Sequence, residues 1–152
     1  MRSLKRSPML RRSLAVSCLF AIAIAANAAE IGQIKVSKGR VEIERQGAIL
    51  PAPVGARLDL SDIVRTGPDG SVGITMSDDS LLSAGPNSVL SLERYAFDPT
   101  THQGRFDAAL NKGTLAVISG RIAKQSPDAM TVRTPTAILG VRGTSFVVQA
   151  NE

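Results

Sequence analysis

Cysteine, tryptophan and histidine are nearly missing from this 152-residue chain, which has one cysteine, no tryptophan and one histidine. One cysteine can form neither an internal disulfide nor a thiolate metal site, and one histidine leaves only carboxylates as candidate metal ligands. Aromatic residues make up 3% of the chain. This scarcity argues against an immunoglobulin-like domain, which is built around a central tryptophan. The length accommodates one ordinary domain rather than two.

Acidic residues are absent before Glu30, whereas five cations occupy the first twelve positions: Arg2, Lys5, Arg6, Arg11 and Arg12. An apolar run follows over residues 14–26, and an Ala-Asn-Ala sequence then ends at Ala28. Basic, apolar and small-residue zones in this order are the layout of a secretory signal peptide. The apolar run is shorter than the roughly 20 residues that a bilayer-spanning helix needs. We predict a signal-peptide helix over residues 1–28, cut between Ala28 and Ala29.

Two other kinds of export signal fit less well. Lipidation at Cys18 would require the apolar run to end there, but the run continues beyond it. The Arg11-Arg12 pair resembles a twin-arginine address, but the residues that follow match it only loosely. We therefore expect ordinary secretion to the periplasm, with release beyond it left open, and no stable membrane insertion after cleavage.

The formal charge of +5 belongs to the export segment rather than to the domain. Five of the 18 cations and none of the 13 acids lie in residues 1–28. Residues 29–152 therefore carry thirteen of each and no net charge. A neutral domain has no excess cations with which to displace the counterions of nucleic acid, so we expect no nucleic-acid partner. Since Cys18 leaves with the signal peptide, the domain must be held together by its hydrophobic core.

Apolar and polar residues alternate in several short runs, which is typical of half-buried strands. The apolar members of these runs are Val41, Ile43, Val72, Ile74, Met76, Leu90 and Leu92. Residues 115–118 and 146–148 are continuous apolar runs, which predict strands buried on both faces. Turn dipeptides such as Gln46-Gly47 and Lys112-Gly113 separate the runs. The pattern predicts a single all-β domain of short strands over residues 29–152, with its core at 35–148. The domain is either β-solenoid-like or a twisted two-sheet sandwich.

No arrangement of residues in the sequence points to catalysis. The sole histidine, His102, lies in a polar loop, and a hairpin turn explains Asp78 and Asp79 better than a calcium loop does. The acids that could form a catalytic carboxylate pair are Glu42, Glu44, Asp59 and Asp62. They stand at alternating exposed positions or before turns, so we expect no enzyme activity, no cofactor and no metal site. The enzyme alternative predicts a concave pocket that holds two acids with perturbed pKa values.

Residues 134–146 read Thr-Pro-Thr-Ala-Ile-Leu-Gly-Val-Arg-Gly-Thr-Ser-Phe. Read physically, Pro135 favours an extended conformation, two glycines bracket a tight bend, and a strand resumes afterwards. The segment resembles the signature of the FecR family of periplasmic domains, Thr-Pro-x-Ala-x-x-Gly-Val-Arg-Gly-Thr-x-Phe. The matching residues are Thr134, Pro135, Ala137, Gly140, Val141, Arg142, Gly143, Thr144 and Phe146. Weaker likeness extends over residues 35–148. At Thr134, Arg142 and Thr144 we favour a role in the fold over contact with a partner.

The resemblance implies a role in signalling. Iron-responsive FecR regulators combine a cytoplasmic anti-sigma segment, a transmembrane helix and a periplasmic domain that receives a signal from an outer-membrane transporter. Only twelve residues precede the apolar run here, so we expect a free-standing exported domain. We expect a non-enzymatic protein-binding module whose partner is another envelope protein, bound through an exposed strand edge. A carbohydrate- or cell-wall-binding module is the alternative. The partner's identity, the oligomeric state, any link to iron, and whether the signal segment is cut or kept as an anchor stay open.

Overall fold

The computed structural model describes residues 29–141 and 145–151. The signal peptide predicted over residues 1–28 therefore lies outside the described residues. The same holds for Arg142, Gly143 and Thr144 of the signature. Within the described part the chain forms a single all-β domain, which confirms the predicted fold class. No helix in these two ranges is long and apolar enough to cross a membrane.

Twelve strands and two very short helical segments form the described domain. The strands are β1 (Gly32–Lys38), β2 (Val41–Arg45), β3 (Ala48–Pro51), β4 (Arg57–Leu58), β5 (Ile63–Thr66), β6 (Ser71–Met76), β7 (Leu81–Ala84), β8 (Val89–Phe97), β9 (Gly104–Ile118), β10 (Met130–Arg133), β11 (Ile138–Gly140) and β12 (Ser145–Ala150). The helical segments are α1 (Arg121–Gln125) and the 3₁₀ turn η1 (Pro127–Ala129).

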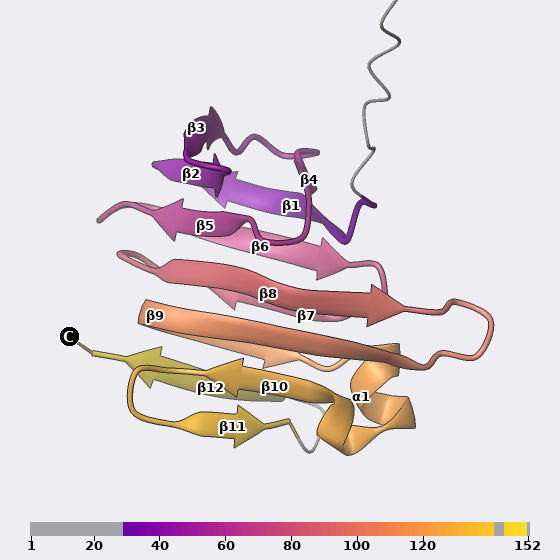
Figure 1. The fold of residues 1–152 in the computed structure, drawn as a ribbon. Coiled ribbons are helices and arrows are strands. Elements are labelled where there is room, and N and C mark those ends of the chain that lie inside the picture. The colour runs from indigo at the N-terminus through magenta and orange to yellow at the C-terminus, as the bar shows by residue number, and fades with distance from the viewer. Residues whose placement is uncertain (1–28, 142–144, 152) are drawn as a thin grey trace, which may run out of the picture.

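The strands form one curled sheet whose two layers face each other (Figure 1). The front layer holds β2, β3, β5, β8, β10 and β11, and the back layer holds β1, β4, β6, β7 and β12. The fifteen-residue β9 belongs to both layers, because its first part pairs with β8 and its last part with β7. All neighbouring strands run antiparallel except β9 and β10. Successive parts of the chain thus lie progressively further along the domain, as in a solenoid. The strands nevertheless form two facing layers, as in a sandwich.

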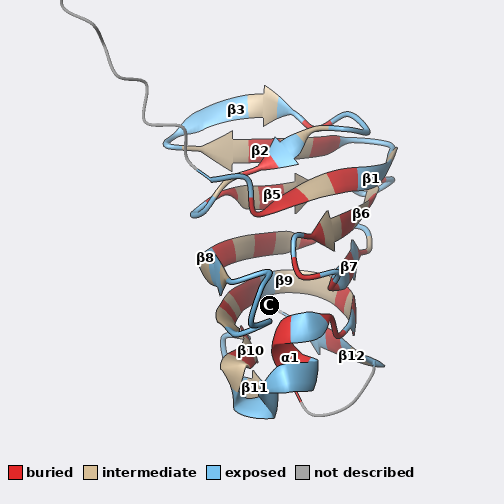
Figure 2. Ribbon diagram, turned by 90° about the vertical axis from the view of Figure 1, so that its right-hand side faces the viewer, coloured by how far each residue is buried: buried red, intermediate tan, exposed pale blue. Residues whose placement is uncertain are grey.

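The predicted period-2 alternation is confirmed in three strands. Buried residues alternate with less buried ones in β2, β6 and β8, as the banding along β8 in Figure 2 illustrates. The turn predicted at Gln46 and Gly47 is also confirmed, with φ angles of 51° and 81°. Two positive φ angles in a two-residue loop are the geometry of a type I′ hairpin, whose twist matches that of the flanking strands.

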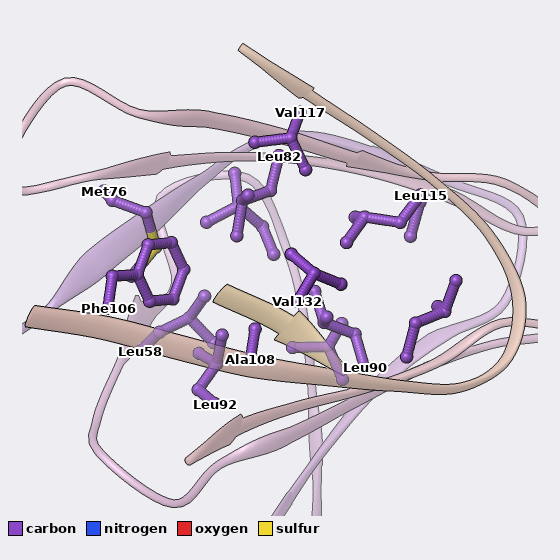
Figure 3. Close-up of a cluster of buried hydrophobic side chains, with 14 of the residues drawn as sticks. Leu58, Met76, Leu82, Leu90, Leu92, Phe106, Ala108, Leu115, Val117 and Val132 are labelled. Carbon is purple, nitrogen blue, oxygen red and sulfur yellow. The ribbon is translucent and has the colours of Figure 1, made fainter. Parts of the chain in front are cut away.

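The hydrophobic core fills the space between the two layers (Figure 3). Its fully buried large side chains are Ile34, Ile43, Leu58, Met76, Leu82, Leu90, Leu92, Phe106, Leu110, Leu115, Ile122 and Met130. Tyr95 meets Phe106 edge to face, with ring centroids 5.4 Å apart. Each fully buried aliphatic side chain contributes about 1.5–3 kcal/mol of hydrophobic free energy. An aliphatic core of this kind stabilises the domain without a disulfide.

Two predictions about the strands are wrong. Residues 115–118 and 146–148 are not buried on both faces, because Ile118 and Val147 point outward with exposed fractions of 46% and 69%. The outer face of the back layer is uncharged here, so the sequence lacks the polar alternation that would have revealed it. The turn predicted at Lys112-Gly113 is also absent, since β9 continues through it. Gly113 instead lies where β9 passes between the layers, with φ of 93°.

Candidate functional site

The curled sheet ends in four edge strands within the described residues, and three of them are poor templates for another strand. β4 has two residues, β11 has three, and β3 has four and ends at Pro51. β12 has six residues, none of them charged and none a proline. Short length, charge and proline are the usual features that protect an edge strand from pairing. β12 is therefore the edge best formed to receive a strand.

β12 uses only one side of its backbone for pairing within the described domain. It runs antiparallel to β9, from Ser145 opposite Ile118 to Ala150 opposite Gly113. Val148 and Ala150 face the core, whereas Val147 is exposed. An edge strand leaves alternate N–H and C=O groups free on its outer side. These groups can form hydrogen bonds with an added strand.

A shallow apolar hollow of about 260 Å³ lies beside this edge. It is lined by Leu139, Gly140, Val141, Phe146 and Val147, which come from β11, β12 and the start of their connection. Proteins that bind a strand at a sheet edge gain affinity from main-chain hydrogen bonds and specificity from pockets for alternate side chains. The hollow and the edge together provide both features.

The structure assigns local roles to the first signature residues. The Thr134 amide donates to the Ala137 carbonyl at 2.8 Å, and the Ala137 amide donates to Thr134 Oγ1 at 3.1 Å. These bonds close the turn between β10 and β11, which supports the predicted role of Thr134 in the fold. Pro135 lies inside this turn, at a bend between β10 and β11.

The later signature residues lie at the hollow. Val141 is 2% exposed, and its amide donates to the Met130 carbonyl at 3.0 Å, which anchors the chain beyond β11. Phe146 packs partly against the core. A Cβ atom at Gly140 would meet nothing within 4 Å. Packing among the described residues therefore does not require a glycine at this position of the signature.

The carboxylates proposed as a catalytic pair are each held by an arginine. Arg45 donates to Asp62 through Nε at 2.8 Å and Nη2 at 2.7 Å, and its Nη1 lies 2.8 Å from Asp59. Asp62 is fully buried and also accepts the Asp59 amide at 2.8 Å. Glu42 and Glu44 pair with Arg40 and Arg65, respectively. Asp62 is thus a buried carboxylate whose charge is satisfied by Arg45 and by a backbone amide, as a buried charge requires. The pairs of Glu42 and Glu44, in contrast, are partly exposed.

The outer face of the front layer carries most of the remaining charge. A hollow of about 330 Å³ there is lined by Glu93, Arg94, Arg105, Asp107 and Arg133, among others. Burial works against ionisation of Asp107, but hydrogen bonds from Arg105 and from Thr131 outweigh it and hold the pKa of this carboxyl below its ordinary value. Arg133 pairs with Glu93. Each arginine is thus paired with an acid, although Arg94 and Arg105 share Asp107 and leave one positive charge in excess. The pairing makes this hollow a weak candidate for binding anions.

Asp78 forms a buried hub that sequence reasoning missed. The turn predicted there is confirmed, but the carboxylate is fully buried. It accepts hydrogen bonds from Ser80 Oγ at 2.8 Å, from Tyr95 Oη at 3.2 Å and from the Ile122 amide at 3.3 Å. The hub therefore joins the β6–β7 turn, β8 and α1. A serine two residues after an aspartate is a common local turn pattern, but the contact with residue 122 had no sequence signal.

Tyr95 is expected to resist ionisation. Burial raises the pKa of its phenol well above the ordinary value near 10, and the charge of Asp78 raises it further. Because an unfolded tyrosine ionises near pH 10, the folded state should lose stability as the pH rises above about 10. Ultraviolet absorbance measures this directly, since Tyr95 is the chain's single tyrosine. A reversible titration of the folded protein near pH 10 would contradict the expectation.

The predicted loop histidine makes one aromatic contact. His102 stacks on Phe97, with ring centroids 6.3 Å apart. Across residues 29–141 and 145–151, no three His, Cys, Asp or Glu side chains are grouped so that they could hold a metal ion.

These features describe a small all-β domain whose best-formed binding feature is a strand edge beside an apolar hollow. Comparison with known protein families matches residues 62–152 to the family described as FecR protein, and the chain belongs to that family. The matched range includes the signature segment and β12. FecR domains are typically associated with the cell envelope, and membership supports a signalling or regulatory role. Comparisons with curated proteins and with solved structures gave no match.

Proposed function

We propose that this protein is a non-enzymatic signalling module of the periplasm that binds another envelope protein through β12. The observation that carries the proposal is the unprotected six-residue edge of β12 next to the hollow lined by Leu139 and Phe146. Membership of the FecR family supports the signalling role. The ion pairs at the candidate acids favour binding over catalysis.

The chemistry of the edge defines the partner segment. A partner strand would add to the free side of β12 and form main-chain hydrogen bonds there. One of its apolar side chains would enter the hollow beside Val141 and Val147. Because β12 carries no charge, the paired segment should be uncharged as well, since an ion placed there would lose water without gaining a partner.

Site-specific photo-crosslinking in cells tests the edge directly. With a photoreactive residue in place of Gln149, which is exposed on β12, we expect a covalent adduct with a different envelope protein. The same probe at Gln103, an exposed position in the loop before β9, is the matched control and should give no such adduct. Absence of an adduct at 149, or an identical adduct at 103, would contradict binding at the β12 edge.

The carbohydrate-binding alternative has less support. Sugar sites commonly offer an exposed aromatic ring as a platform, and this chain has no tryptophan. Of its four aromatic residues outside the predicted signal peptide, Phe106 is fully buried, and Tyr95, Phe97 and Phe146 pack partly against the core.

A further inference from the structure

The outer face of the back layer is free of charge over four adjacent strands. β6, β7, residues 113–118 of β9 and β12 contain no acidic or basic residue. We name the outward side chains of these strands the uncharged face. Its members are Ser71, Gly73, Thr75, Leu81, Ser83, Thr114, Ala116, Ile118, Ser145, Val147 and Gln149. The front layer differs sharply, because charged side chains project from β2, β5, β8, β9 and β10.

Large apolar side chains are exposed on this face. Leu81 is 42% exposed, Ile118 is 46% exposed and Val147 is 69% exposed. Leu81 and Ile118 are direct cross-strand neighbours, so they form one continuous patch. Single exposed apolar side chains are normal on soluble proteins, whereas contiguous apolar patches of more than roughly 300 Å² mark surfaces that bind a partner.

The uncharged face is organised in two parallel rows that cross the strands. The ridge row has its largest side chains in the middle and consists of Thr75, Leu81, Ile118 and Ser145. The trough row has small side chains except at its β12 end and consists of Gly73, Ser83, Ala116 and Val147. The rows lie two residues apart along each strand, a separation of about 7 Å. The face is therefore a ridge beside a trough.

We propose that the uncharged face binds the same face of a second copy of this chain. A two-fold axis that lies in the interface, parallel to the rows and midway between them, places the ridge of each copy over the trough of the other. Leu81 then lies over Ser83 of the second copy, and Ile118 lies over Ala116. Symmetric dimers require such a self-complementary patch, and sheets packed face to face with nearly aligned strands are a common arrangement.

The chemistry of the face favours a copy of itself over a lipid surface. Proteins that lie on membranes do so through basic residues and aromatic anchors, and the uncharged face has neither. A second uncharged face introduces no ion that would lose its water, whereas a charged partner would.

The size of the face predicts a weak dimer. Four strands spaced about 4.8 Å apart and four to six residues long cover at most roughly 400 Å² on each copy. The total of at most about 800 Å² is below the roughly 1,200–2,000 Å² that stable complexes bury. We therefore expect a dissociation constant on the order of 100 μM, with dimers that form and separate reversibly.

Sedimentation velocity on protein expressed from the full chain tests the proposal, at concentrations from about 10 μM to about 1 mM. The wild type should shift from monomer to dimer over this range. Ile118→Lys should raise the dissociation constant at least about tenfold, because the dimer would bury an unpaired ammonium group. Ser83→Lys should raise the dissociation constant by a similar factor, because Ser83 lies in the trough row of the same interface. Ile49→Lys is the matched control, since Ile49 is 56% exposed on β3, away from the face, and it should dimerise like the wild type.

The outcomes separate this proposal from the proposed function. A wild type that stays monomeric up to about 1 mM overturns the dimer, and so does an unchanged dissociation constant in both lysine variants with unaltered thermal unfolding. Gln149 belongs to the uncharged face, so an adduct between two copies of this chain at position 149 would report the dimer, whereas an adduct with a different protein reports the edge. The main-chain groups on the free side of β12 stay open in the face-to-face dimer. Ile118→Lys should therefore keep the photo-crosslink at position 149, and a dimer without that adduct contradicts only the proposed function.

Discussion

Gly113→Ala is expected to lower the free energy of unfolding by about 3–5 kcal/mol. Gly113 has φ of 93°, which strains any residue with a Cβ atom. The added Cβ would also lie 2.2 Å from Ser88 Oγ and 2.5 Å from Ser88 Cα, so backbone must move to make room. The movement would disturb the hydrogen bond from the Thr114 amide to Ser88 Oγ at 3.1 Å. Chemical denaturation measures the loss.

Gly55→Ala separates the two causes. Gly55 has nearly the same backbone conformation, with φ of 91°, but a Cβ there would meet nothing within 4 Å. Gly55→Ala should therefore lower the free energy of unfolding only by the strain of a positive φ, about 1–2 kcal/mol. If both alanine variants lose equal stability, the contact between Gly113 and Ser88 is not what holds β9 in place.

Asp78→Asn is expected to destabilise the domain by about 3 kcal/mol. Oδ1 accepts bonds from the Ser80 amide and Tyr95 Oη, and Oδ2 accepts bonds from Ser80 Oγ and the Ile122 amide. An asparagine keeps one oxygen and turns an NH₂ group toward donors on the other side. On either side the NH₂ group would meet a backbone N–H that can only donate, that of Ser80 or that of Ile122, in a fully buried site. Such a clash of donors costs more than the loss of one bond.

The neighbouring residue supplies the control. Asp79 is exposed and pairs with Arg121 at 2.7 Å, and its φ of 66° is one that asparagine also adopts. Asp79→Asn should therefore change stability by less than about 1 kcal/mol. Thermal unfolding of both variants measures the difference. Equal melting temperatures would show that the buried carboxylate of Asp78 contributes no more to stability than the exposed one of Asp79.

Much of the fold could be predicted because its elements are defined locally. Val72, Ile74 and Met76 alternate with smaller residues, and β6 follows them closely. The hairpin at Gln46 and Gly47 needs only two residues that tolerate positive φ. The strand edge was expected as a mode of binding, but its location at β12 depends on which strands end the sheet, and that is a property of the topology.

The sequence could not reveal the features that join distant segments. Gly113 looks like a turn glycine because Ser88, which crowds it, is far away in the chain. Asp78 looks like a turn residue because its bond to the Ile122 amide depends on where α1 docks. Residues 146–148 look like a buried strand because an uncharged surface and a core leave the same apolar pattern.

The passage of β9 through both layers has a consequence for unfolding. β9 is the shared neighbour of β8, β10, β7 and β12, so the front and back layers cannot separate without breaking its ladders. Loss of the β9 pairing in one layer should therefore weaken its pairing in the other layer. The layers should thus unfold as one cooperative unit.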